Sequence, residues 1–206
     1  MHKEVLNKKQ LSLLDVVKHF SDKDFYLAGG TALALQIDHR ESRDFDIFSY
    51  NKFENQDIYK DLLDLDLNKK DFKVVIDKLD EYTLFIKDVK FTFLRYPFHI
   101  EDIIQEEGIS LADTLNIGAM KAYALGRRSK WKDYVDLYIL LQTISLDTLI
   151  SKANTIFDDV FSEKMFRQQL CYFKDVDFSE EVIWRIDKPP KNEKIVDFLK
   201  NIAVKE

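Results

Sequence analysis

The residues with the clearest capacity for chemistry lie between positions 29 and 46. Asp44 and Asp46 alternate with Phe45 and Ile47 in a run typical of a β-strand, so both carboxylates project from one side of it. Two carboxylates held side by side repel each other unless a cation lies between them, and Mg2+ takes such oxygens as ligands. The pattern predicts a Mg2+ site; the alternative is an exposed edge strand with hydrated aspartates.

A glycine pair precedes this strand. Gly29 and Gly30 follow an apolar run at residues 25–28 that predicts a buried strand, and Thr31 stands where a helix N-cap is expected. Glycine permits a sharp turn and a close ligand approach because it has no Cβ. A strand, a glycine turn and a helix N-terminus together offer N–H groups to a phosphate. Two further candidates for the same phosphate lie just before the aspartates, namely Arg40 and Ser42.

Lys121 is the one charged residue in a predicted helix of small and apolar residues at 117–125. It is either a surface lysine whose stem lies along the helix or a cation that faces phosphates or a leaving pyrophosphate. Helical periodicity leaves both interpretations open.

Asp136 lies in a predicted helix at 132–141 that is apolar nearly all round, which predicts that the carboxylate is buried. A buried carboxylate is costly unless it is paired or binds a metal. Lys132, four residues earlier, and Lys121 are possible partners, and Asp133 lies on nearly the same face. The alternative to a catalytic role is an ion pair that clamps two helices.

The elements that position these residues divide the chain into two halves. Between the helix at 4–20 and the three later strands, the first half alternates helices and strands, which predicts a mixed sheet. In the first half we predict helices at 4–20 and 56–67 and strands at 25–28, 44–48, 72–76, 82–86 and 89–94. From about Leu111 the pattern becomes helical. In this second half we predict helices at 132–141, 146–157, 162–173 and 193–204. We expect an α+β fold, with a mixed α/β domain at 1–105 and a helical domain at 106–206.

The composition excludes several classes of protein. The 206 residues are 46% hydrophobic and 13% aromatic, which is typical of a folded globular chain. Cys171 is the single cysteine, so an intramolecular disulfide is excluded. Apolar runs fall short of the roughly 20 residues of a membrane span, and the N-terminal residues lack a signal-peptide core. We therefore expect a cytoplasmic location and no membrane partner.

The net charge of -6 is a poor overall match for nucleic acid, whose binders usually carry a basic surface. Local basic patches remain possible. Lysine and arginine cluster at residues 127–132 and again at 188–194. The first cluster is a candidate for contact with the backbone of a nucleic acid.

Four sequence blocks together resemble the AbiEii family of nucleotidyltransferase-like toxins, which belongs to the DNA polymerase β-type nucleotidyltransferase superfamily. They occur in family-like order and spacing over residues 25–142. The blocks are Gly29-Gly30-Thr31-Ala32-Leu33-Ala34-Leu35, then His39-Arg40-x-Ser42-x-Asp44-Phe45-Asp46-Ile47-Phe48, then Met120-Lys121-Ala122-Tyr123-Ala124-Leu125-x-Arg127, and finally Lys132-Asp133-Tyr134-Val135-Asp136-Leu137-Tyr138-x-Leu140-Leu141. The resemblance implies a nucleotidyltransferase-like sheet domain followed by a helical region.

The resemblance also implies roles for particular residues. The turn at 29–31 would cradle the triphosphate of an NTP, and Asp44 and Asp46 would hold Mg2+ that bridges the phosphates. Lys121 would neutralise the phosphates. The late acidic residue would act as a base or as an orienting group; Asp136 is the first choice and Asp133 the second.

The resemblance also implies a substrate and a partner. Members of the family transfer a nucleotide to RNA, in some cases to the 3′ end of tRNA, and are paired with an antitoxin encoded nearby. The resemblance therefore predicts an Mg2+- and NTP-dependent toxin of a toxin–antitoxin or phage-defence system.

The chain departs from the superfamily pattern in two places. A third carboxylate usually lies on a neighbouring strand, but residues 91–94 supply none, and Asp88 falls in a predicted turn. The acidic residue expected shortly before Lys121 is replaced by Asn116, with Asp113 further upstream. Two alternatives follow, namely a catalytically silent nucleotide- or protein-binding module and a nucleotidyltransferase whose acceptor is a protein or a small molecule.

Overall fold

The structure is a computed structural model that describes residues 1–65, 67–125 and 127–205. The chain forms two compact units. The first comprises residues 1–37 and 42–112, and the second comprises 38–41 and 113–206. The short segment 38–41 therefore packs with the second unit although it lies within the first in sequence. Position 66 of the helix predicted at 56–67 lies outside the described residues.

The first unit is built on a mixed sheet, which confirms the predicted α+β class. In its described residues the sheet has seven strands in the order β3-β4-β5-β2-β1-β7-β6. The pairs β2–β5 and β1–β7 are parallel and the others are antiparallel. The strands are β1 Tyr26–Ala28, β2 Phe45–Ser49, β3 Phe72–Lys78, β4 Glu81–Ile86, β5 Val89–Arg95, β6 Ile103–Glu106 and β7 Ile109–Ala112.

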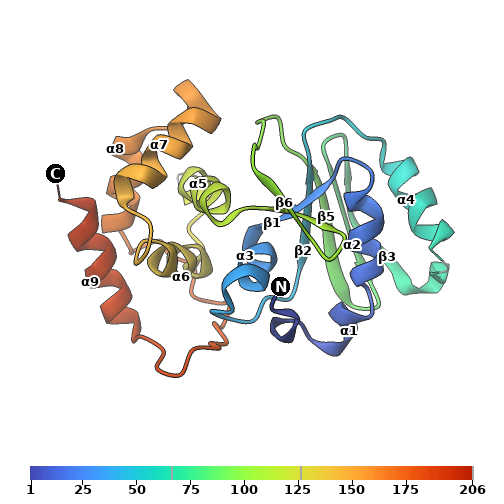
Figure 1. The fold of residues 1–206 in the computed structure, drawn as a ribbon, viewed down its shortest axis with the longest axis horizontal. Helices are drawn as coiled ribbons and strands as arrows, with labels where there is room; N and C mark the ends of the chain where they lie inside the picture. Colours follow the sequence, from blue (N-terminus) through green and yellow to red (C-terminus); the bar gives the residue numbers. More distant parts are fainter. Residues whose placement is uncertain (66, 126, 206) are drawn as a thin grey trace. The chain divides into compact units, whose positions relative to one another are not determined.

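Alternation along β2 separates a packed face from a polar one. Phe45 and Ile47 are buried, whereas Asp46 on the opposite face is partly exposed. Helix α2 (Leu14–Ser21) packs against the first face, where the Phe20 and Phe93 ring centroids lie 4.6 Å apart (Figure 1). Burial of these rings orients the strand, so the acidic side chains face away from the core. We call this second face the aspartate face.

Over the ranges that the structure describes, the first unit has five further helices, and the N-terminal region forms several short helices in place of the one that was predicted. They are η1 Lys3–Val5, α1 Lys8–Leu11, α3 Gly29–Ile37, α4 Asn55–Asp64 and η2 Lys69–Asp71. The single helix predicted at 4–20 is wrong, because Asn7 starts a new helix there. Its side chain accepts a hydrogen bond from the Gln10 N–H at 3.0 Å, and the Gln10 side chain accepts one from the Asn7 N–H at 3.1 Å.

The hairpin β6–β7 was not predicted, and Leu111 lies in β7 rather than at the start of the helical pattern. The turn of this hairpin places Glu107 and Gly108 at φ 52° and 81°, as two-residue hairpin turns require. Every residue of β7 is buried. A strand buried on both faces loses its alternation and cannot be distinguished from a buried helix by periodicity.

The second unit is helical, as predicted. Its helices are α5 Thr114–Leu125, α6 Trp131–Leu140, α7 Leu146–Phe157, η3 Asp158–Val160, α8 Glu163–Cys171 and α9 Asn192–Ala203. Tyr134, Leu137 and Leu149 are fully buried in its core. Helices α5 and α7 approach closely at Gly118, where a Cβ would lie 2.7 Å from the Leu149 Cδ1.

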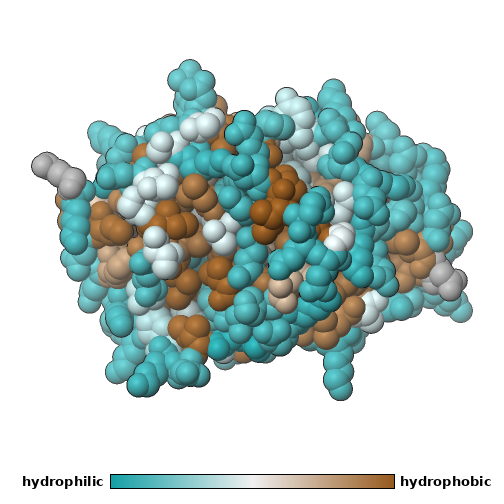
Figure 2. Space-filling model, in the orientation of Figure 1, coloured by the Kyte–Doolittle hydropathy of each residue, from teal (hydrophilic) through white to brown (hydrophobic). Residues whose placement is uncertain are grey.

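Hydrophilic residues cover most of the area over α2 and α4 in Figure 2. In the described part of the chain, no helix combines the length and the apolarity that crossing a bilayer requires.

Candidate active site

The glycine turn and Asp46 are in direct contact in the first unit. Helix α3 begins at Gly29, whose φ of 68° is rare for residues with a side chain. A Cβ at this position would lie 2.6 Å from the Asp46 Oδ2. Glycine is therefore required for its backbone conformation and for the space that the carboxylate occupies.

Thr31 is not the N-cap of α3, so that prediction is wrong. Because the helix begins two residues earlier, Thr31 lies in its first turn and is buried. Its hydroxyl donates a hydrogen bond to the backbone carbonyl of Asp44 and lies 2.7 Å from the Ser42 Oγ. Thr31 thus ties α3 to the segment that leads into β2.

Asp44 lies beside a lysine that the sequence reasoning missed. Its Oδ2 is 3.3 Å from the Nζ of Lys90, at the start of β5. The parallel register pairs Phe45 with Phe91 and Asp46 with Thr92. The neighbouring strand therefore presents Lys90 and Thr92 on the aspartate face, where a third carboxylate was found to be absent from the sequence.

The donor set around the two aspartates fits a hard divalent cation. Both side chains are partly exposed on one face, and Asp46 is seated in the space that Gly29 leaves free. Mg2+ commonly binds one or two protein carboxylates and completes its shell with water and phosphate oxygens. The ammonium of Lys90 stands against Asp44 as a monovalent counterion.

A second group of predicted residues meets inside the second unit, around the fully buried Asp136. Its Oδ1 accepts hydrogen bonds from the Arg40 Nε at 2.6 Å and lies 2.8 Å from the His39 Nε2. Its Oδ2 accepts bonds from the Arg40 Nη2 at 2.8 Å and the Lys121 Nζ at 2.7 Å. Both carboxylate oxygens are therefore occupied by strong donors.

Lys121 joins Asp136 to a second carboxylate. Its Nζ lies 2.7 Å from the Asp133 Oδ1, and only about 4% of Lys121 is exposed. The Arg128 Nε donates to the Asp133 Oδ2 at 3.0 Å, from a side chain that is half exposed. Of the two interpretations of Lys121, this burial rules out the surface lysine, and α5 and α6 are clamped by buried ion pairs. We call Arg40, Lys121, Arg128, Asp133, Asp136 and His39 the buried charge network.

The network shifts the pKa values of its members. Burial opposes ionisation of Asp136, but the charges of Arg40 and Lys121 outweigh it and hold the pKa of Asp136 well below its usual range. Burial likewise opposes the charge on Lys121, yet the two carboxylates raise its pKa. Burial lowers the pKa of His39, against the opposing effect of Asp136. The carboxylates are thus ionised and His39 is neutral at pH 7.

The segment Asp38–Glu41 carries two members of the network and pairs with the chain before α9. The Glu41 N–H donates to the Ile183 carbonyl at 2.8 Å, and the Arg185 N–H donates to the His39 carbonyl at 3.1 Å. The Arg185 side chain also forms an ion pair with Asp38. We call residues 38–41 the strap, because it leaves the first unit after α3 and returns before β2.

The structure therefore gathers the predicted site residues into two sets. Gly29, Gly30, Thr31, Ser42, Asp44 and Asp46 belong to the first unit, whereas Arg40, Lys121, Asp133 and Asp136 belong to the buried charge network of the second. Arg40 was expected to share a phosphate with Ser42; its guanidinium instead lies against Asp136 and is 3% exposed. Alternation along 89–95 was the one signal that pointed to Lys90.

The basic segment 127–132 is partly neutralised within the second unit. Lys130 and Lys132 contact the two oxygens of Glu180 at 2.7 and 3.1 Å. The Arg127 guanidinium lies 3.5 Å from the centroid of the Tyr123 ring and donates to its backbone carbonyl. These contacts reduce the charge that the segment offers to a nucleic acid.

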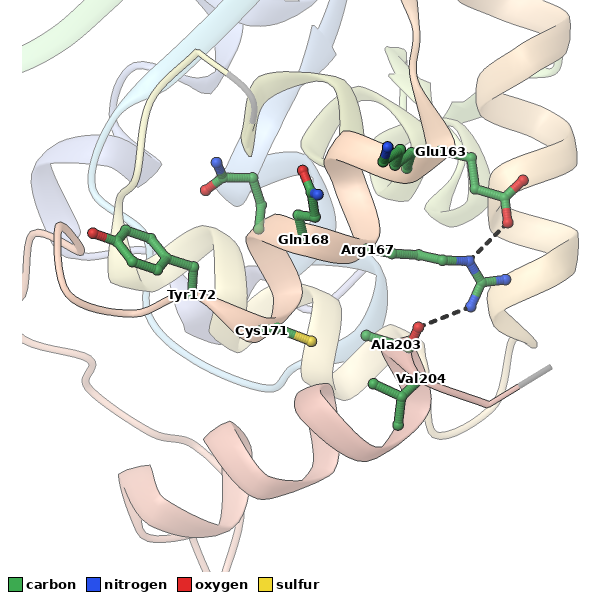
Figure 3. A pocket seen from close by; sticks show the side chains of 9 residues that line it. Glu163, Arg167, Gln168, Cys171, Tyr172, Ala203 and Val204 are labelled. Atoms are coloured by element: carbon green, nitrogen blue, oxygen red, sulfur yellow. Dashed lines mark hydrogen bonds and ion pairs between the residues drawn. The ribbon is translucent and has the colours of Figure 1, made fainter.

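A hollow of about 1020 Å³ lies between α8 and the end of α9, and its lining contains none of the predicted site residues. Figure 3 shows Arg167 reaching across it, with bonds to the Glu163 Oε1 at 2.7 Å and the Ala203 carbonyl at 3.1 Å. Cys171 lines the same hollow, whose lining includes no histidine or aspartate to act as a base. The arginine caps the C-terminus of α9, which is a structural role.

Comparison with known proteins identifies the family. Residues 12–111 match the model of the nucleotidyltransferase AbiEii toxin, a type IV toxin–antitoxin component. An uncharacterized protein of Aquifex aeolicus, aq_aa25, is 31% identical over 212 residues and covers 98% of this chain and 97% of its own length. The chain belongs to the AbiEii family of nucleotidyltransferase toxins, and the predicted family is confirmed.

Solved structures share the fold. JHP933 from Helicobacter pylori is 19% identical, with a TM-score of 0.58 over 96% of this chain and 91% of its own. MenT4, a nucleotidyltransferase toxin from Mycobacterium tuberculosis, is 12% identical, with a TM-score of 0.59 over 94% of this chain and 82% of its own. The sheet and the helical unit are thus both parts of a known architecture.

Proposed function

We propose that this nucleotidyltransferase toxin uses Mg2+ to transfer a nucleotide from an NTP to an RNA acceptor such as tRNA. The proposal rests on one observation. Asp46 in β2 and Asp44 immediately before that strand project from the same side, with Asp46 seated in the space left by the Gly29 turn at the start of α3. Two carboxylates that could bind a metal and the N-terminal N–H groups of α3 together support this proposal.

The chemistry assigned to this point is an in-line displacement. Mg2+ held by the two aspartates would polarise the phosphates and offset charge that develops on the leaving group. The acceptor hydroxyl gives up its proton to water as its oxygen forms a bond to the α-phosphorus. The bond from the α-phosphorus to the bridging oxygen breaks, and pyrophosphate leaves with that oxygen. Backbone N–H groups at 29–31 bind the triphosphate. The Thr31 hydroxyl is already bonded to Asp44 and contributes by positioning.

For Asp136 we favour an orienting role over that of a general base. A base works best when its pKa lies near the working pH, whereas the pKa of Asp136 is held well below its usual range by Arg40 and Lys121. Asp133, also buried and paired, has a lowered pKa as well. In this proposal Asp136 orients Arg40 and Lys121 within the buried charge network of the second unit.

The test is a transfer assay with purified protein, Mg2+, each α-labelled NTP in turn and total tRNA. We expect Asp46→Ala and Asp46→Asn to lower transfer by more than about a hundredfold, because a metal ligand is lost. Asp57→Asn removes an exposed charge from α4 and serves as the matched control with normal activity. Undiminished transfer by both Asp46 variants would show that the assignment is wrong.

The same assay separates the alternatives. Label on an added protein or small molecule, but not on tRNA, would change the acceptor and keep the reaction. Mg2+-dependent NTP binding without any labelled product would favour the catalytically silent module, for which the missing third carboxylate is the motivating observation. Family membership implies a cognate antitoxin, and we propose that a protein encoded beside this chain suppresses the transfer.

A further inference from the structure

A hollow of about 690 Å³ at one end of the sheet carries an unusual number of lysines. It lies wholly in the first unit, between α1, η2 and the turn that joins β4 to β5. Its lining residues are Lys9, Ser12, Lys70, Asp71, Phe72, Lys73, Phe85, Lys87 and Asp88. We call it the lysine hollow.

Most of its positive charge is uncommitted. Lys9 forms an ion pair of 2.6 Å with Asp88. Among the described residues, the ammonium groups of Lys70, Lys73 and Lys87 have no hydrogen-bond or carboxylate partner, and all three residues are exposed. With Asp71 as the remaining carboxylate of the lining, the hollow has a net positive charge. An anion is the ligand that such a surface attracts.

The floor of the hollow is aromatic. Phe85 is half-buried in β4, and among the described residues its ring has no aromatic partner. The sheet register places Lys73 of β3 directly beside it on one side and Lys90 of β5 on the other. A ring flanked by cations on neighbouring strands presents a stacking surface between two phosphate-binding groups.

The lysine hollow is continuous with the candidate active site. Lys90, the register partner of Phe85, contacts the Asp44 carboxylate at 3.3 Å. The row Lys73–Phe85–Lys90–Asp44 therefore runs across β3, β4 and β5 on the aspartate face to the residue that immediately precedes β2. Neighbouring strands lie about 4.8 Å apart, so the three steps of this row span about 14 Å.

We propose that the lysine hollow binds the single-stranded end of the RNA acceptor. Lys70, Lys73 and Lys87 contact backbone phosphates, and a base stacks on Phe85. Lys90 then leads the terminal nucleotide towards Asp44. This inference rests on the proposed function, since it names the surface through which the acceptor reaches the same aspartates.

The chemistry of the row favours a polynucleotide over an acidic protein. Alternating cations and an aromatic ring match alternating phosphates and bases, whereas an acidic peptide offers carboxylates but needs no stacking surface. The competing basic segment at 127–132 is engaged with Glu180, Asp133 and Tyr123. Among the described residues, the ammonium groups of Lys70, Lys73 and Lys87 have no such partner, and they lie in the same unit as Asp44 and Asp46.

The test measures binding in the absence of NTP and Mg2+, with a fluorescent single-stranded RNA of mixed sequence. In the triple variant Lys70→Ala, Lys73→Ala, Lys87→Ala we expect binding weakened at least about tenfold. The slope of log affinity against log salt should fall by about 2, because each single-strand phosphate contact contributes about 0.7. The matched control removes three exposed lysines of the second unit, Lys188, Lys191 and Lys194, and should bind normally.

A second pair of variants tests the stacking. Phe85→Ala should weaken binding roughly five- to hundredfold, and Phe85→Tyr should restore it, because a phenol ring still stacks. Circular dichroism on both verifies the fold. Unchanged RNA binding in both the triple lysine variant and Phe85→Ala would overturn the proposal, as would equal losses in the control triple. Loss of antitoxin binding alone would assign the hollow to a protein.

This experiment is separable from the test of the proposed function. Asp46→Ala should bind the RNA like the wild type while it fails to transfer. If Asp46→Ala transfers normally, the active-site assignment falls, and the binding result for the lysine hollow is unaffected. If the triple lysine variant and Phe85→Ala bind RNA like the wild type while Asp46→Ala fails to transfer, the proposed acceptor surface is wrong and the active-site assignment stands.

Discussion

At the scale of single residues, the most demanding position is Gly29. Few residues combine a positive φ with a neighbour so near that a methyl group has no room. The clash would fall on a candidate metal ligand, because the atom in the way is the Asp46 Oδ2. The glycine is therefore coupled to the chemistry and not only to the turn.

Gly29→Ala should lower the free energy of unfolding by about 1–3 kcal/mol and should also abolish transfer, since Asp46 must move. Gly108→Ala is the matched control. Gly108 has a φ of 81° in the β6–β7 turn, and its Cβ would lie 3.8 Å from the nearest side chain, Lys18. It should lose similar stability in chemical denaturation yet keep its activity. Equal activities in the two variants would contradict the coupling.

His39 is the residue that should make stability depend on pH near neutrality. Burial lowers its pKa below the unfolded value of 6.5, so the unfolded chain binds a proton more readily than the folded chain. The contribution of neutral His39 to the free energy of unfolding is complete above pH 6.5. It is lost as the pH falls towards the pKa of His39 in the folded chain. The buried Nδ1, which has no partner among the described residues, agrees with a neutral ring.

We expect the free energy of unfolding of the wild type to fall below pH 6.5 by up to about 1.4 kcal/mol for each pH unit from this residue. In His39→Asn this part of the slope should disappear. Denaturant titrations above and below pH 6.5 measure it, with a substitution of the exposed His99 by Asn as the control. A slope that persists in His39→Asn and vanishes in His99→Asn would assign the effect to another group.

At the scale of elements, the strap connects two kinds of structure. By sequence it joins α3 to β2, and by packing it belongs to the helical unit, where Asp136 binds both Arg40 and Lys121. Replacing two buried charges by an apolar pair is often tolerated, but removal of one partner is not. The strap is therefore most sensitive at the single carboxylate that its arginine contacts.

Asp136→Ala should destabilise the protein by about 3–5 kcal/mol, because Arg40 is left buried without its carboxylate. Amide hydrogen exchange should increase at Glu41 and Arg185, whose N–H groups form the strap pairing. Asp136→Asn keeps the shape of the side chain and should show a smaller loss. Unchanged exchange at both amides in Asp136→Ala would contradict the anchoring role of the network.

At the scale of the whole molecule, charge is distributed very unevenly. The chain carries a net charge of -6, which by itself argues against an RNA ligand. The lysine hollow concentrates unpaired cations next to the sheet, while many other basic groups pair with nearby acids. Local potential, rather than net charge, decides where a polyanion can bind.

Much of this protein is determined by its sequence alone. Strict alternation in β2 placed Asp44 and Asp46 opposite the buried Phe45 and Ile47, and the apolar periodicity of the later segments defined most helices of the second unit. Local patterns succeed where an element has one buried face, because burial then leaves a periodic trace. Beside the resemblance to the family, these patterns were enough to predict the fold class and the candidate metal pair.

Only the tertiary structure decided which charges meet. Neither the contact of Lys90 with Asp44 nor the four donors around Asp136 follow from spacing, because their partners lie far apart in sequence. Strand β7 was missed because a strand buried on both faces loses its alternation. Side-chain pairing across strands and helices depends on register and packing, and these are properties of the folded chain as a whole.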